Sequence, residues 1–250
     1  MPFRFGQGKI CYLYAVFYPY PFMSTLLTIE TSTPVCSCAL SRDGEILVNK
    51  ENYEGRSHAS LVGLFVHEIM EYAREQDIHP DAIAVSSGPG SYTGLRIGVS
   101  EAKGLSYGLD IPMIAIPTAR IMASMMREKA DENTLLCPMI DARRMEVYAT
   151  IFDRSLNVIR ETSADIVEVD SYVDLLEKQK IIFFGNGAEK CRTVITHPNA
   201  RFFDDIHPLA SGMVSLAEKA FVDKRFVDIA YFEPFYLKEF VATIPKNKLL

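Results

Sequence analysis

Apolar runs and polar turns alternate at the start of the chain and predict three antiparallel strands. The run from Leu26 to Ile29 ends in polar residues 31–33, which is typical of a buried strand that enters a turn. Residues 36–41 and 45–49 flank Asp43 and Gly44, a turn pair that predicts a β-hairpin. The chain is therefore expected to open as a β-meander.

Two long helices are predicted next, because apolar residues recur there at helical spacing. The first runs from His58 to about Arg74 behind Ser57 as its N-cap, and its apolar positions cover more than one face. One face can therefore pack on a sheet while another remains for a partner. The second helix runs from about Tyr92 to Tyr107 and closes at a glycine.

The remaining pattern predicts an α/β fold in two units. Strands are predicted at 82–86, 111–116, 135–140, 147–152 and 181–184, helices at 117–129, 173–178 and 213–224, and an extended edge or tail segment at 231–237. This order implies mixed sheets with helices packed on them. We place the first lobe at residues 23–130 and the second at 131–250.

Residues 1–22 form an aromatic-rich extension that lies outside this pattern. Its apolar run, Ile10 to Tyr18, is short for a membrane span, and no small-residue cleavage site follows it, although a weak signal peptide remains an alternative. Because a natural strand begins directly after Met23, we interpret Met23 as the start of translation.

Composition describes a folded chain without a strong affinity for nucleic acid. Of 250 residues, 48% are hydrophobic and 23% charged, which is enough for a full core, and the net charge is −6. A negative chain lacks the field that neutralises phosphates, so contact with nucleic acid is expected to be indirect. The five cysteines lack zinc spacing and are interpreted as thiols of a reducing cytosol.

The loop Ser87-Gly-Pro-Gly-Ser follows a strand and leads into the second helix. Such a loop presents free amides at a helix N-terminus, which suits anions, but it matches neither a Walker A loop nor a Rossmann fingerprint. Within that helix, Gly94, Gly98 and Ala102 recur every four residues and form a smooth stripe. The stripe packs either on the chain's own sheet or against a partner helix.

Other polar groups give weaker indications of chemistry. His58 and His67 stand nine residues apart and cannot share one metal ion as neighbours on a helix. The strand-end Glu30 is interpreted as a cap for nearby amides, and Gly185-Asn186-Gly187 as a turn. Asp141, Arg143, Arg144 and Glu146 form a charged cluster that we expect to tie the lobes together. Cys137 has no evident base and is not expected to be a nucleophile.

Several blocks together resemble the TsaB family, formerly YeaZ. They are Ile29-Glu-Thr-Ser-Thr, Ser87-Gly-Pro-Gly-Ser-Tyr-Thr-Gly-Leu-Arg-Ile-Gly-Val, Ala102-Lys-Gly-Leu, Ile116-Pro-Thr, Asp141-Ala-Arg-Arg-Met-Glu-Val-Tyr and Glu233-Pro-Phe-Tyr-Leu. They follow the family's order from about Ser24 to Leu237. The resemblance implies a two-lobed actin, Hsp70 and sugar-kinase-like (ribonuclease H-like) fold.

The resemblance also implies that the chain has no catalytic residue, no metal site and no cofactor of its own. The related enzyme TsaD carries two histidines that hold a metal just after the corresponding loop, helix and strand. This chain has Thr118 and Met122 at the matching positions. Neither side chain replaces an imidazole as a metal ligand.

As a TsaB-like chain, the protein is expected to be a cytoplasmic, non-catalytic scaffold that activates TsaD. TsaD transfers threonylcarbamoyl to the adenosine next to the anticodon of tRNA. TsaE would act through the heterodimer, TsaC would act upstream, and the chain would contact tRNA only indirectly and no membrane. A homodimer could use the same surface. The residues predicted to contact the partner are Leu61, Phe65, Tyr72, Gly94, Gly98 and Ala102.

Two alternatives remain from the sequence. One is a small-molecule kinase or acyltransferase of the same superfold with ATP between its lobes. The other is a glycoprotease, which the sequence opposes because it offers neither a zinc triad nor a convincing nucleophile and base.

Overall fold

Three antiparallel strands open the first lobe in the computed structural model, which describes residues 24–55 and 58–238. They are β1 (Thr25–Glu30), β2 (Cys36–Arg42) and β3 (Glu45–Asn52). Strand β4 (Ala82–Ser86) then pairs parallel to β1, and β5 (Met113–Ile116) parallel to β4. The sheet order is β3-β2-β1-β4-β5. The predicted β-meander and the two further strands of a mixed sheet are therefore confirmed, and the structure adds that these two strands run parallel to β1.

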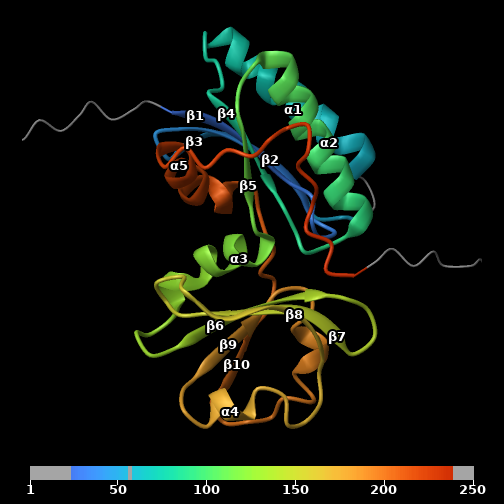
Figure 1. The fold of residues 1–250 in the computed structure, drawn as a ribbon, viewed down its shortest axis with the longest axis vertical. Coiled ribbons are helices and arrows are strands. Elements are labelled where there is room, and N and C mark those ends of the chain that lie inside the picture. The colour runs from blue at the N-terminus through green and yellow to red at the C-terminus, as the bar shows by residue number, and fades with distance from the viewer. Residues whose placement is uncertain (1–23, 56–57, 239–250) are drawn as a thin grey trace, which may run out of the picture.

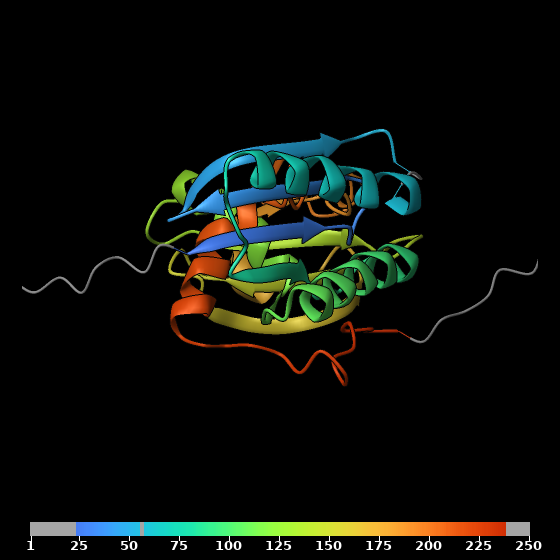
Figure 2. The same cartoon turned by 90° about the horizontal axis from the view of Figure 1, so that it is seen from above.

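Helices cover both faces of this sheet, as the alternation of buried side chains along its strands requires. Leu27 and Ile29 of β1 face α1 (His58–Glu75) and α2 (Tyr92–Leu109), whereas Leu26 faces the opposite way, toward α5 (Val214–Val222). Figure 1 shows α1 and α2 side by side on one face and α5 on the other. In Figure 2 the two long helices lie along the sheet, roughly parallel to its strands.

The second lobe repeats this plan. Its strands are β6 (Leu135–Asp141), β7 (Glu146–Phe152), β8 (Val158–Ile166), β9 (Ile181–Phe184) and β10 (Ala200–Phe203). The sheet order is β10-β9-β6-β7-β8, with β6, β7 and β8 antiparallel and β9 and β10 parallel. In each lobe, the first three strands form a meander and the last two add in parallel on the other side of the first strand. This duplicated topology confirms the predicted two-lobed fold with mixed sheets.

The lobes meet around α3 (Thr118–Met126), which packs on the inner face of the second sheet. A short helix, α4 (Val173–Leu176), belongs to the far side of that sheet. The chain then returns, because Met213, Ala217 and Ala220 pack against Leu26 and Ile114 of the first sheet. The boundary at residue 130, which would divide the chain into two independent folding units, stays a prediction.

Two strands were not predicted from the sequence, β8 and β10. Their side chains are mostly half-exposed or exposed, so they lack the clean apolar pattern of the inner strands. The proposed N-cap Ser57 and the extension 1–22 with its start at Met23 lie outside the described residues. Among the helices that are described, none combines the length and apolar character of a membrane span.

Candidate functional site

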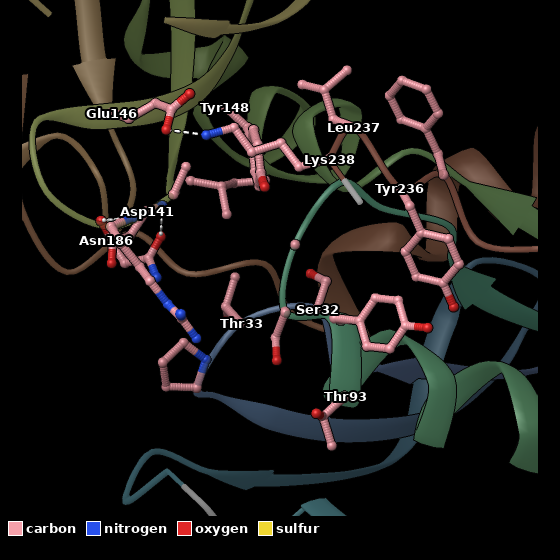
Figure 3. Close-up of a pocket in the computed structure, with 18 of the residues that line it drawn as sticks. Ser32, Thr33, Thr93, Asp141, Glu146, Tyr148, Asn186, Tyr236, Leu237 and Lys238 are labelled. Carbon is pink, nitrogen blue, oxygen red and sulfur yellow. Dashed lines mark hydrogen bonds and ion pairs between the residues drawn. The ribbon is translucent and has the colours of Figure 1, made fainter. Parts of the chain in front are cut away.

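A cleft of about 580 Å³ lies between the lobes. Its first wall comes from the turn after β1, with Ser32 and Thr33, and from the start of α2, with Thr93. The opposite wall comes from the β6–β7 turn and Asn186 (Figure 3). The C-terminal segment 235–238 also lines the cleft, so the cleft unites three parts of the chain that are distant in sequence.

The glycine loop fixes the N-terminus of α2 at this cleft. A Cβ at Gly90 would overlap the carbonyl oxygen of Ser32, so only glycine permits the loop to lie this close to the turn after β1. The Ser91 N–H donates to Ser32 O at 2.7 Å, and the Ser91 side chain accepts from Gly94 N at 3.2 Å as the helix cap. The loop and its position before the helix agree with the prediction from the sequence.

The tight turn between β6 and β7 carries two arginines. Arg143 and Arg144 have φ values of 71° and 50°, in the left-handed region that residues with a Cβ rarely adopt. The turn is held by Asp141 Oδ1, which accepts from Arg143 N at 3.2 Å, and by Asn186 Oδ1, which accepts from Asp141 N at 3.1 Å. Asn186 therefore belongs to a structural turn after β9, as predicted.

The charges of the cleft are only partly paired. Asp141 pairs with Lys190 of the same lobe, and Glu146 pairs with Lys238 of the C-terminal segment. Neither arginine of the β6–β7 turn makes an ion pair with any residue of ranges 24–55 and 58–238. The prediction that this cluster ties the lobes together is therefore wrong for Arg143, Arg144 and Asp141, whereas Glu146 pairs with the C-terminal segment.

That C-terminal segment connects both walls of the cleft. The Phe235 N–H donates to Ser87 O at 2.7 Å, and the Tyr236 ring packs on the Tyr92 ring with centroids 4.7 Å apart. Three residues after Phe235, Lys238 reaches Glu146 across the cleft. The segment predicted as an extended tail is thus the third wall of the site.

Glu30 lies behind the turn after β1 and is fully buried. Burial raises its carboxyl pKa to about 6, and hydrogen bonds donated by Ser32 and Ser86 limit the rise. Oε1 accepts from Ser32 N at 2.6 Å and from Ser86 Oγ at 3.1 Å, while Oε2 has no partner among the described residues. The carboxylate caps nearby amides, as predicted, and thereby holds the turn that forms one wall.

The small-residue stripe of α2 packs inside the chain. A Cβ at Gly94 would overlap the Thr31 carbonyl oxygen, a Cβ at Gly98 would overlap Thr31 Oγ1, and Ala102 is fully buried in the first core. Thr31 Oγ1 also donates to Gly94 O at 2.7 Å. The prediction that Gly94, Gly98 and Ala102 contact a partner is therefore corrected, because the turn after β1 and the sheet occupy that stripe.

The outer sides of α1 and α2 form a different surface. Leu61, Phe65 and Tyr72 are half-buried and pack against the chain's own core. Between them, Leu64 is 47% exposed, and a Cβ at Gly63 or Gly104 would meet open space. A shallow groove begins near Ala59 and runs along α2. We call this surface, with Ala59, Gly63, Leu64, Ser100 and Gly104, the α1/α2 face.

Thr118 and Met122 lie at the start of α3 and are fully buried. Met122 belongs to the core between α3 and the second sheet, and a Cβ at Gly185 would overlap its Cε atom. The described part of the chain contains no group of three or more His, Cys, Asp or Glu side chains able to hold a metal ion.

The histidines and cysteines have local roles. His58 Nε2 lies 2.7 Å from Thr33 O, while His67 is exposed on α1, so the two do not meet. The described cysteines, Cys36, Cys38, Cys137 and Cys191, are free and buried. Burial raises the pKa of each thiol, which opposes the thiolate that a nucleophile needs.

Known sequences similar to this chain include proteins of tRNA threonylcarbamoyladenosine biosynthesis. Residues 48–246 match the family model described as TsaD, tRNA N6-adenosine threonylcarbamoyltransferase. The chain is 30% identical over 224 residues to the tRNA threonylcarbamoyladenosine biosynthesis protein TsaB of Escherichia coli, an alignment that covers 87% of this chain and 96% of that protein. The protein of the same name from Haemophilus influenzae is 29% identical, with coverages of 86% and 93%.

Solved structures agree with this result. The structure of YeaZ from Pseudomonas aeruginosa is similar with a TM-score of 0.73 at 27% sequence identity. The match covers 86% of this chain and 100% of that chain. A second structure from the same organism, of an uncharacterized protein with similarity to peptidase YEAZ, has a TM-score of 0.74 at 26% identity, with the same coverages.

Proposed function

The chain belongs to the TsaB (YeaZ) family, and from this membership we propose that it acts in tRNA threonylcarbamoyladenosine biosynthesis as a non-catalytic partner of TsaD. The observation that carries the proposal is the similarity to TsaB along nearly the whole length of that protein. In this role the chain binds TsaD and activates it, TsaE acts on the heterodimer, and tRNA is contacted only indirectly. It requires no cofactor of its own.

The chemistry of α3 supports a role without catalysis. Thr118 and Met122 stand at the positions that match the two metal-binding histidines of TsaD, and both are packed inside the protein. A thioether in an apolar core and a lone hydroxyl are poor ligands for a hard cation or for zinc. A metal that polarises the transferred group would have no equivalent site here.

The α1/α2 face supports a docking role. Its exposed positions Gly63, Ser100 and Gly104 are small, so a partner helix can approach the backbone closely. Leu64 supplies exposed apolar area between them, and the half-buried Leu61, Phe65 and Tyr72 remain candidates at its edges. We propose that TsaD packs here, and that a homodimer of the free chain uses the same face.

Binding to purified TsaD tests the docking proposal directly. Gly104→Arg places a long charged side chain into open space on α2, so the fold is expected to tolerate it while the partner helix is excluded. We expect co-elution of the native chain with TsaD in size exclusion, and an affinity for TsaD that is at least about tenfold weaker in the variant.

The matched control is Ser155→Arg, which adds the same side chain to an exposed turn of the second lobe. This control should bind TsaD like the native chain, and thermal unfolding should show both variants to be folded. If Gly104→Arg bound TsaD with native affinity, the proposal that TsaD packs on the α1/α2 face would be contradicted. Absence of any complex with the native chain would contradict the proposed function itself.

A further inference from the structure

We propose that residues 233–238, here called the strap, couple the α1/α2 face to the second lobe. The strap holds the start of α2 in the arrangement that TsaD binds, and TsaD in turn holds the strap in place. This inference rests on the function proposed above and concerns the regulation of its docking surface. The strap residues act by positioning others, because the groove of the α1/α2 face is lined by α1 and α2 and not by residues 233–238.

The glycine loop before α2 accommodates the strap. The Phe235 N–H donates to Ser87 O at 2.7 Å. A Cβ at Gly88 would lie 2.7 Å from Phe235 O, and Gly88 has a φ of 98°, a conformation that favours glycine. The same loop contacts the start of α3, where the Thr118 N–H donates to Gly88 O at 3.0 Å. The strap therefore binds the first lobe close to the point where the chain passes into the second.

Tyr92 is the residue through which the strap meets the α1/α2 face. Its ring contacts the ring of Tyr236 in the strap, with centroids 4.7 Å apart. The Arg96 guanidinium lies over the same Tyr92 ring, 5.2 Å from its centroid, and Arg96 Nη1 donates to Tyr92 Oη at 3.3 Å. Tyr92 and Arg96 both line the groove that runs along α2. The strap therefore supports two side chains that a docked partner would contact.

The other end of the strap reaches the second lobe. Lys238 pairs with Glu146 at the start of β7, which Figure 3 shows as a dashed line. Residues 233–238 form neither helix nor strand, so the strap depends on contacts with its neighbours to stay in place. It has an attached and a detached state, and contacts at both ends favour the attached state. A contact made at one end therefore biases the other end, which is the requirement for coupling.

An attached strap favours docking because it restricts the side chains of the groove. Groups that are already held in place lose less entropy when a partner binds. Loss of the Tyr236 ring releases Tyr92, so the affinity for TsaD should fall about fivefold in Tyr236→Ala. Tyr236→Phe keeps the ring and should bind TsaD like the native chain. The matched control Tyr231→Ala removes a ring that is 85% exposed and should also bind with native affinity.

Glu146→Gln releases the other end of the strap without changing the first lobe. Because the ion pair with Lys238 is partly exposed, we expect the affinity for TsaD to fall at most about threefold. The double variant with Tyr236→Ala should bind no more weakly than Tyr236→Ala alone, since a strap detached at one end cannot transmit a change at the other. The control Glu161→Gln removes the same charge from an exposed position of β8 and should leave the affinity unchanged. Calorimetric titration of full-length chains measures these affinities.

Amide hydrogen exchange at Phe235 measures the reciprocal effect. TsaD should slow this exchange about fivefold in the native chain, because coupling between two sites is symmetric. In Tyr236→Ala, TsaD should no longer slow it, whereas direct cover of the strap by TsaD would slow it in both chains. In the free chain, exchange at Phe235 should be faster in Glu146→Gln than in Glu161→Gln, because only the first variant detaches the strap.

Three results would overturn the coupling while a native complex with TsaD still forms. They are native affinity in Tyr236→Ala, additive weakening by Tyr236→Ala and Glu146→Gln, and equal protection of Phe235 by TsaD in the native chain and in Tyr236→Ala. Equal exchange at Phe235 in the free Glu146→Gln and Glu161→Gln chains would overturn the strap without any use of TsaD. Absence of a complex with the native chain would instead contradict the proposed function and, with it, the coupling.

Discussion

Gly98 and Gly104 lie on different sides of α2, one packed against the chain and one facing open space. Gly98 lies against Thr31, whereas Gly104 faces open space. In Gly98→Ala the new methyl group must displace Thr31, so we expect a loss of about 1–3 kcal/mol in the free energy of unfolding. Gly104→Ala should instead gain about 0.5–1 kcal/mol from helix propensity. Urea unfolding of both variants measures the sign of the change in the free energy of unfolding. Equal changes in the two variants would contradict the inward packing of the stripe.

Glu30 makes the stability of the protein depend on pH. Its pKa is about 6 in the folded chain against 4.5 as the ordinary value, so the folded state binds this proton more tightly than the unfolded state. The protonated carboxyl therefore stabilises the fold fully at pH values below its ordinary pKa of 4.5. This contribution to the free energy of unfolding, about 2 kcal/mol, is lost as the pH rises through the pKa of the folded chain.

Glu30→Gln should therefore lack this loss. The quantity to compare is the free energy of unfolding of the variant minus that of the native chain. This difference should be about 2 kcal/mol larger at about pH 7 than at about pH 4. Other carboxylates contribute equally to both chains and cancel in the difference. Urea unfolding at the two pH values measures the difference. An unchanged difference between variant and native chain would show that the carboxyl titrates normally.

Single residues could be predicted from the sequence where their role is local. The capping role of Glu30 and the turn at Asn186 follow from neighbouring residues, and the structure confirms both. The direction of the Gly94 stripe could not be predicted, since helical spacing gives a smooth face but does not say what covers it. Likewise, the pairing of Asp141 with Lys190 depends on a residue about fifty positions away.

At the scale of elements, periodicity predicted both long helices and eight of the ten strands found in residues 24–55 and 58–238. Strands β8 and β10 were missed because they lie at sheet edges, where alternation of apolar and polar residues is weak. The sequence also placed no element opposite α1 and α2 on the first sheet. The amphipathic pattern of α5 requires an apolar partner surface, but nothing local says which sheet provides it.

The C-terminal segment is an element without regular structure that is held by few contacts. In Tyr236→Ala the ring contact with Tyr92 is lost, a contact worth about 1 kcal/mol for an aromatic pair. We expect amide hydrogen exchange at Phe235 to become about fivefold faster, because its bond to Ser87 O opens more often. The control is Tyr231→Ala, since Tyr231 is 85% exposed, and equal acceleration in the control would contradict a specific role for Tyr236.

At the scale of the whole molecule, the two lobes share a strand order without a sequence repeat that would have predicted it. Family motifs indicated the two-lobed fold, and the topology confirms it. The path of the chain was less accessible, because α5 and the segment to residue 238 return to the first lobe. This return links the lobes more closely than a simple boundary at residue 130 suggests.

A fragment of residues 1–130 tests the importance of that return. Without α5, Leu26 and Ile114 on one face of the first sheet lose their cover, so we expect a fragment with exposed apolar surface and no cooperative thermal transition. Adding a peptide of residues 206–238 should restore part of the cooperativity. A fragment that unfolds cooperatively by itself would instead support residues 23–130 as an independent unit.

The central claim is that this chain activates TsaD without catalysing the transfer itself. The most direct measurement is threonylcarbamoyladenosine formation in tRNA with TsaD alone, this chain alone and both together, each supplied with TsaE, ATP and the threonylcarbamoyl adenylate made by TsaC. We predict product only, or at least about tenfold faster, when both chains are present. Modified tRNA from this chain without TsaD would contradict the claim.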